Sequence, residues 1–127
     1  MKDCKFEDTY HVVLFKMRPD TPQQYRNILI DGAIGRVRVG VEASTWTQFF
    51  DKADRDPMPA SGVDNVVCRN CHLECTRFFY KNSKSGDYTL SNFTFTDIWA
   101  EDPDTTFDTS NIKNCVIENV TINGKKF

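Results

Sequence analysis

Three cysteines and a histidine lie within eight residues, in the order Cys68-x-x-Cys71-His72-x-x-Cys75. Thiolates and imidazoles are the side chains that bind zinc in proteins, so this stretch has the residue types of a zinc site. Zinc sites, however, usually pair two short clusters across a loop, whereas Cys68 follows Val66 at an inward position of an apolar segment. We therefore favour buried thiols over a zinc site, with a cysteine–cysteine bridge as the remaining alternative.

The cysteine count supports the same interpretation. The chain has five cysteines, an odd number, and no secretory signal is recognisable in the sequence. These features do not indicate a disulfide framework. We expect no metal ion and no cofactor.

Aromatic rings suited to ligand binding lie in a long insertion, residues 43–62 (ASTWTQFFDKADRDPMPASG). Trp46, Phe49 and Phe50 can stack on the apolar faces of sugars or dock a partner, and long insertions in repeat proteins often form a binding face. The alternative is that Phe49 and Phe50 pack the insertion against the rest of the chain. A second excursion, residues 100–110, carries Asp102, Asp104 and Asp108; we expect a solvated loop there, because it matches no calcium-binding pattern.

The elements that position these residues follow from a nine-residue pattern that occurs five times. Its third residue is Asn or Asp, followed by an apolar residue, any residue and a second apolar residue. The third positions are Asp3, Asn27, Asn65, Asn92 and Asn114, at intervals of 22 to 38 residues. Apolar residues at a spacing of two predict a strand with one buried face, and the Asn and Asp residues predict turns. Repetition at this interval is typical of a solenoid.

The repeat predicts an all-β fold, a right-handed single-stranded parallel β-helix of about five coils, forming one domain over residues 1–127. Stacked coils would align the five Asn and Asp residues in a ladder of side chains. The third residue of each strand would form a core stack of Phe6, Ile30, Cys68, Phe95 and Ile117. Met1 already falls inside a repeat copy, so we expect the β-helix to be truncated at its N-terminal end.

Composition excludes several classes of function. The formal net charge is −2 and the pI is about 5.6, which gives no basic surface for nucleic acid or for an anionic membrane. No run of 18 apolar residues is present, so we expect no transmembrane helix, and the charged N-terminal segment does not resemble a signal peptide.

Two short stretches carry a family resemblance, TYHVVLFKM at residues 9–17 and Tyr25-Arg26-Asn27-Ile28. Together with the repeat pattern they resemble the C-terminal part of polygalacturonases, glycoside hydrolase family 28. The resemblance implies a pectin lyase-like β-helix that binds an acidic, pectin-type polysaccharide. In that family an Arg-x-Lys pair holds the substrate carboxylate.

The resemblance implies substrate contacts near the N-terminal end of the chain. Lys16 matches the Lys of the Arg-x-Lys pair, Leu14 stands at the Arg position, and Arg18 or Arg26 would have to supply the second cation. Trp46 is the aromatic candidate for the same ligand. The family's catalytic segments, Asn-Thr-Asp, Asp-Asp and Gly-His-Gly, do not occur in this sequence. Because inverting hydrolysis requires two carboxyl groups, we expect no catalytic residue and no activity from this chain alone.

Three hypotheses follow. The chain is the C-terminal portion of a polygalacturonase-like hydrolase, or a non-catalytic carbohydrate-binding β-helix, or an assembly module. In the last case an open coil end would stack on a second copy, forming a homodimer, or on an upstream β-helix portion. The resemblance implies action outside the cytoplasm, in an extracellular or periplasmic location.

Overall fold

The computed structural model describes residues 1–17, 23–45, 61–81 and 88–127. Within these ranges the chain forms strands and no helix, so none of the described residues belongs to a helix that could cross a lipid bilayer. The strands are β1 (Lys5–Met17), β2 (Gln24–Asp31), β3 (Ile34–Thr45), β4 (Ser61–Glu74), β5 (Arg77–Lys81), β6 (Tyr88–Glu101), β7 (Ile112–Ile122) and β8 (Lys125–Lys126). Arg18, Trp46 and most of the predicted insertion 43–62 lie outside the described residues.

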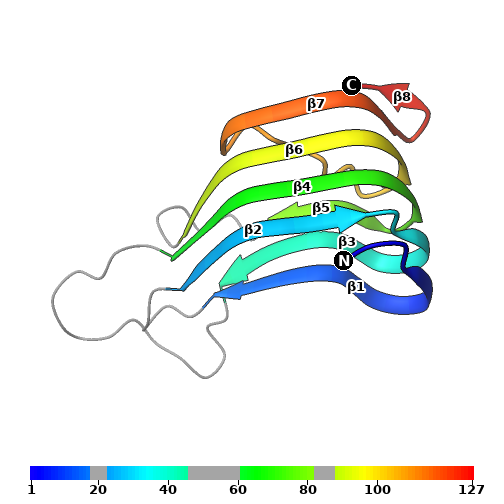
Figure 1. Ribbon diagram of the computed structural model, residues 1–127. Helices are drawn as coiled ribbons and strands as arrows, with labels where there is room; N and C mark the ends of the chain where they lie inside the picture. Colours follow the sequence, from blue (N-terminus) through cyan, green and yellow to red (C-terminus); the bar gives the residue numbers. More distant parts are fainter. Residues whose placement is uncertain (18–22, 46–60, 82–87) are drawn as a thin grey trace, which may run out of the picture.

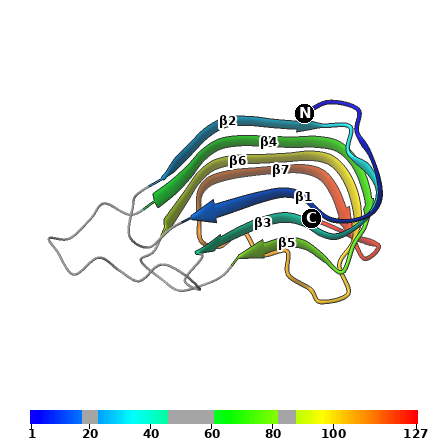
Figure 2. The ribbon, with the colours of Figure 1, turned by 90° about the horizontal axis from the view of Figure 1, so that it is seen from below.

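The strands pair almost entirely in parallel. β2, β4, β6 and β7 are successive neighbours, as are β1, β3 and β5, while β3 also pairs with the C-terminal end of β4. Only the short β8 is antiparallel to its neighbour β7. Figure 1 shows the strands stacked one above another, and Figure 2 shows them curving around one end of the molecule. The predicted all-β class is confirmed, and this mostly parallel sheet is compatible with a β-helix.

The long strands bend at Asn and Asp residues whose φ is positive. In β4 these are Asn65 (φ 57°) and Asn70 (φ 54°). The same five-residue spacing recurs at Asn92 and Asp97 in β6, and at Asn114 and Asn119 in β7. Asn and Asp adopt this left-handed conformation more readily than other residues with a Cβ atom.

Each bend adds one residue to the alternation between buried and exposed side chains. In β4 the buried side chains after Ser61 and Gly62 are Val63, Val66, Cys68, Cys71 and Leu73, three residues apart across a bend and two apart between bends. Without the additional residue, the side chains beyond each bend would face solvent. The bends therefore keep one apolar face directed inward along the whole curved strand.

The predicted asparagine ladder forms at four of its five positions. Asn65 Nδ2 donates to Asn27 Oδ1 at 2.8 Å, and Asn114 Nδ2 donates to Asn92 Oδ1 at 3.3 Å. Between these two pairs the amide ladder is interrupted, because Asn92 Nδ2 donates to Asp64 Oδ1 at 2.7 Å.

The prediction is wrong for Asp3. Lys2 bridges to Asp31, which places Asp3 beside Gly32, in line with the second bend of the other strands. The reason lies in the pattern, because both bends consist of Asn or Asp followed by apolar-x-apolar. Asn70-Cys71-His72-Leu73 fits it as well as Asn65-Val66-Val67-Cys68. A pattern of this length cannot distinguish the two bends.

The predicted core stack is confirmed for Ile30, Cys68, Phe95 and Ile117, which occupy one register position on successive strands. Phe6 was wrongly included, because it pairs with Gly35. Gly35 has φ 122°, and a Cβ atom there would lie 2.0 Å from the Phe6 carbonyl oxygen. Only glycine fits this close approach of two backbones.

Phenylalanine rings dominate the middle of the core. Phe78, Phe79, Phe93 and Phe95 are at most 1% exposed and pack at tilted or edge-on angles, with centroids 5.6 to 6.1 Å apart. Phe107 extends this cluster, contacting Phe78, Phe95 and, at the C-terminal end, Phe127. Tilted aromatic pairs of this kind add stabilisation beyond the area they bury.

The acidic segment 100–110 differs from its prediction at one residue. Asp102 was expected in a solvated loop, but its side chain is 0% exposed. Its carboxylate accepts hydrogen bonds from the Thr106 and Phe107 backbone amides at 2.7 and 2.9 Å, and from the Thr106 hydroxyl. A buried carboxylate is tolerated when its oxygens are satisfied in this way, so Asp102 organises the loop that carries Phe107 into the core.

The bends generate the first prediction. Asn65→Ala removes the ladder hydrogen bond and places an ordinary side chain at φ 57°, and we expect it to lower the free energy of unfolding by about 2 kcal/mol. Asn65→Gly also removes the hydrogen bond, but glycine tolerates the φ angle. We therefore expect its decrease in the free energy of unfolding to be about half as large. Urea denaturation of the two variants measures the difference. Equal losses would show that the left-handed conformation carries no cost at this bend.

Candidate functional site

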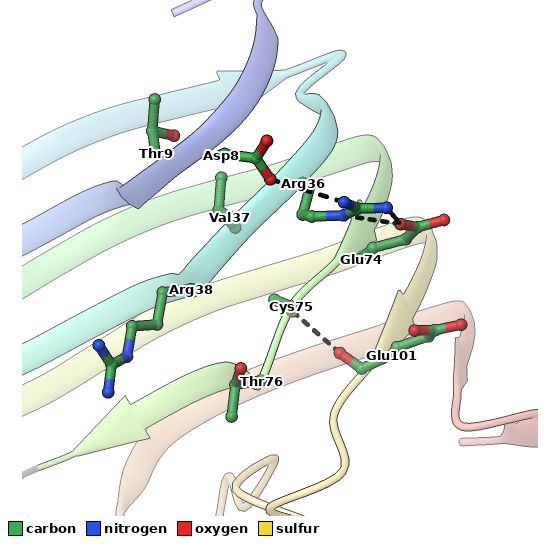
Figure 3. Close-up of a pocket in the computed structure, with 9 residues that line it drawn as sticks. All are labelled: Asp8, Thr9, Arg36, Val37, Arg38, Glu74, Cys75, Thr76 and Glu101. Atoms are coloured by element: carbon green, nitrogen blue, oxygen red, sulfur yellow. Dashed lines mark hydrogen bonds and ion pairs between the residues drawn. The ribbon is translucent and has the colours of Figure 1, made fainter.

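Two adjoining grooves lie on the outer surface where β1 and β3 pass the C-terminal end of β4. Their volumes are about 620 and 640 Å³, and they share the side chains of Asp8, Arg36 and Glu74. Figure 3 shows the first groove, which continues to Arg38 and to Glu101 at the end of β6. Alternation along Gly35-Arg36-Val37-Arg38 buries Val37 and directs both arginines outward.

Arg36 lies between two carboxylates. Its Nη2 is 3.2 Å from Glu74 Oε2, and its Nη1 is 3.7 Å from Asp8 Oδ1. Arg36 and Glu74 are register partners on neighbouring strands, which explains the contact. All three side chains are about half exposed or more, so these ion pairs contribute little stability, and their main effect is to hold Arg36 in place.

Arg38 has a different environment. Its guanidinium lies over the ring of Tyr10, 5.2 Å from the ring centroid, and it forms no ion pair with the residues that the structure describes. The Tyr10 side chain is 55% exposed. Arg38 and Tyr10 therefore present a cation and an aromatic surface together to solvent at the edge of the groove.

A second arginine–tyrosine pair lies on β5. Arg77 is 4.6 Å from the Tyr80 ring centroid, and its Nε donates to Asp104 Oδ2 at 3.0 Å. The hydrogen bond to Asp104 raises the pKa of the Arg77 guanidinium above its ordinary value. Unlike Arg38, Arg77 already has a carboxylate partner.

The cysteine–histidine stretch does not form one cluster. Cys68, Cys71 and Cys75 are buried, whereas His72 points outward and stacks on Trp99 with ring centroids 4.3 Å apart. The burial of these three thiols agrees with the predicted interpretation. In the parts of the chain that the structure describes, no three His, Cys, Asp or Glu side chains gather in a way that would hold a metal ion.

Lys16 and Arg26, the two predicted ligand contacts that the structure describes, do not meet in the grooves. Lys16 lies near the C-terminal end of β1, away from Asp8 and Thr9, and its carbonyl oxygen accepts a hydrogen bond from the Tyr25 hydroxyl at 2.9 Å. Arg26 lies on β2 opposite Asp64. The pKa of the Asp64 carboxyl is lowered, first by the hydrogen bond from Asn92 and in smaller part by the charge of Arg26. The placement of Arg18 and Trp46 is outside the described residues.

Sequence reasoning missed Arg36, Arg38 and Tyr10. A signal was present, because Arg36 and Arg38 alternate with valines and so had to share the exposed face of a strand. Nothing in the sequence placed Tyr10 beside them, since that contact depends on the register between β1 and β3.

No protein-family model matches this sequence, and no significantly similar curated protein or solved structure was found. The chemistry of the groove residues is therefore the basis for assigning a function.

The groove also generates a prediction about thiol reactivity. Cys75 lines it, but the thiol is buried and donates to the Glu101 carbonyl oxygen at 2.9 Å. Burial, with the nearby Asp102 and Glu101 charges, raises the pKa of Cys75 to about 12. Because the thiolate is the reactive form, we expect iodoacetamide at pH 8 to modify the partly exposed Cys4 well before Cys75 in the native protein.

Mass spectrometry of digested samples gives the order of labelling. In denaturant the protection of Cys75 should be lost and all five cysteines should react. Native labelling of Cys75 as fast as Cys4 would contradict the burial of this thiol.

Proposed function

We propose that this chain is a carbohydrate-binding segment of a right-handed parallel β-helix related to the polygalacturonase type. It binds an acidic, pectin-type polysaccharide along the groove that contains Arg36 and Arg38. The observation that carries the proposal is Arg38, which lies over an exposed tyrosine ring and has no ion pair among the described residues.

The groove has the groups that an acidic sugar requires. A guanidinium binds a carboxylate through two parallel hydrogen bonds, so Arg38 suits the carboxylate of a uronate residue. The exposed part of the Tyr10 ring offers an apolar contact beside it, and the carboxylates of Glu74 and Glu101 can accept hydrogen bonds from sugar hydroxyls. Arg36 is held between Asp8 and Glu74, which leaves Arg38 as the principal anchor for the ligand's charge.

The spacing of the arginines supports the same class of ligand. The family that the sequence resembles uses two cations two residues apart on one strand, and Arg36 and Arg38 have this spacing. Leu14 and Lys16, where the resemblance placed the pair, include only one cation. The substrate anchor of this chain is therefore assigned to β3 in place of the end of β1.

Binding without hydrolysis is the activity we assign to this chain alone. Glycoside hydrolysis needs an acid and a second carboxylate on opposite sides of the scissile bond. The family's aspartate segments do not occur in this sequence. The location we assign, by the same resemblance, is extracellular or periplasmic.

Calorimetric titration with oligogalacturonates tests the proposal. We expect binding of the acidic oligomers and none of neutral oligosaccharides of equal length. Arg38→Gln should weaken the affinity about tenfold or more, because it removes a charge-assisted hydrogen-bonding pair. Lys16→Gln, on the same sheet but outside the groove, is the matched control and should bind as the unmodified chain does.

Two results would contradict this assignment. Unchanged affinity in Arg38→Gln together with weaker binding in Lys16→Gln would show that the ligand binds at the end of β1 and not in the groove. The absence of heat with every oligosaccharide would exclude the carbohydrate-binding function. Circular dichroism of each variant shows whether the fold is kept.

A second candidate function is assembly, favoured by the open strand edges at the two ends of the stack. At one end β8 pairs with only Thr121 and Ile122 of β7. At the other end β1 pairs only with β3 within the described residues, so one edge of a 13-residue strand lacks a neighbouring strand. Tyr10 and Leu14 are exposed on this strand, and the partner we propose is a second copy of the chain, paired edge to edge as a homodimer.

Sedimentation velocity over a wide range of protein concentration tests this homodimer. We expect a dimer whose dissociation constant rises at least tenfold in Leu14→Lys, because a lysine on an edge strand opposes strand pairing. Val116→Lys places the same change at an exposed apolar position on β7 and should leave association unchanged. A monomer at every concentration would exclude the homodimer.

A further inference from the structure

Two cysteines of β4 face each other across a bend. Cys68 and Cys71 are 1% and 3% exposed, and their Sγ atoms are 3.6 Å apart. Asn70, with φ 54°, lies between them. In a straight strand, side chains three residues apart point to opposite faces, but this bend directs both thiols into the core.

We propose that Cys68 and Cys71 form a redox modification site, at which a small peroxide converts the two thiols into an intramolecular disulfide. A disulfide requires sulfur atoms about 2.05 Å apart, so the two must approach by about 1.5 Å. Side-chain rotation about the Cα–Cβ bonds on the inside of the bend can supply this approach.

The contacts around the pair assign a role to each sulfur. The two sulfur atoms lie within hydrogen-bond distance of each other, and the Cys71 thiol also donates to the Arg69 carbonyl oxygen at 3.2 Å. The hydrogen bond with Cys68 first, and then those from the Ala33 and Gly32 backbone amides, lower the pKa of Cys71 despite its burial. The same hydrogen bond and burial raise the pKa of Cys68. Cys71 is also the more exposed of the two, at 3% against 1%, so we assign Cys71 as the attacking thiolate and Cys68 as the resolving thiol.

The reaction balances with peroxide as the only oxidant. The Cys71 thiolate attacks one peroxide oxygen, the O–O bond breaks, and the departing hydroxide takes a proton to become water, leaving a sulfenic acid on Cys71. Cys68 then attacks that sulfur, forming the S–S bond, while its proton and the sulfenic hydroxyl leave as a second water. Two thiols are oxidised, and one hydrogen peroxide is reduced to two waters.

The other cysteines are poorly placed to form a disulfide with either member of the pair. Cys75 donates to the Glu101 carbonyl oxygen, and its pKa is raised to about 12. Cys115 lies on β7, in register with Phe93 of β6, and Cys4 precedes β1, so neither lies on the strand that carries the pair. All five thiols are free in the structure.

The test treats the native protein with hydrogen peroxide, blocks the remaining thiols with N-ethylmaleimide in denaturant and counts them by mass spectrometry. We expect the number of free thiols to fall from five to three. Trypsin cleaves after Arg69, between the two cysteines, so oxidation should join two tryptic peptides that separate on reduction. Cys71→Ala should abolish the loss of two thiols, whereas Cys75→Ala, a buried cysteine on the same segment, should retain it.

Three outcomes would overturn the proposal. These are five free thiols after peroxide treatment, a disulfide that includes Cys4, Cys75 or Cys115, and an unchanged loss of two thiols in Cys71→Ala. If Cys71→Ala does not fold, the tryptic map of the unmodified chain decides the question alone, because it identifies the joined peptides directly. Fragmentation of the joined peptides distinguishes Cys71 from Cys75.

Discussion

The whole architecture depends on a left-handed backbone conformation at a few Asn, Asp and Gly residues. Each long strand must turn without losing parallel pairing to the strands on both sides, and a single residue at positive φ makes that turn. Because the bends recur at equal spacing in β4, β6 and β7, they stack in register, and Asn114 and Asn119 of β7 donate to Asn92 and Asp97 of β6. The same residue therefore makes the turn with its backbone and the interstrand hydrogen bond with its side chain.

This constraint also determines what the outer surface can present. Parallel register places equivalent positions of successive strands side by side, so outward residues form rows across the sheet. Ile34, His72 and Trp99 form one such row, and Arg36, Glu74 and Glu101 form the next. The charged groove therefore depends on the register between the strands as well as on the sequence of each strand. An arginine between two acids arises because three strands bring together residues that are far apart in the chain.

The parts of the fold that local chemistry controls were predictable. Alternation in segments such as Phe93-Thr94-Phe95 predicted the strands, and Asn27, Asn65, Asn92 and Asn114 predicted the ladder. Asp3 and Phe6 were placed wrongly because the first and second bends have the same local sequence pattern. Only the pairing between distant strands shows which of the two bends a segment forms. Asp102 was missed for a related reason, since its burial depends on a loop that folds back over Phe78 and Phe95.

The site was less predictable than the fold. A charged residue on an exposed strand face has no local feature that distinguishes a ligand contact from ordinary surface. Arg36 and Arg38 differ only in their neighbours, because Asp8 and Glu74 reach one and Tyr10 reaches the other.

The parallel stacking of the strands has a consequence for how the chain folds. Ladder partners are separated by 22 to 38 residues, as between Asn92 and Asn114 or between Asn27 and Asn65. These separations are about 17 to 30% of the chain length, and long-range pairing of this kind is typical of slow-folding β proteins. Among the strands that the structure describes, no tight hairpin joins two long strands, so each long strand must close a loop of the chain before it gains its first contact with another. We therefore expect the search for the first correctly aligned pair of strands to limit the folding rate, because each further strand then adds to an existing edge.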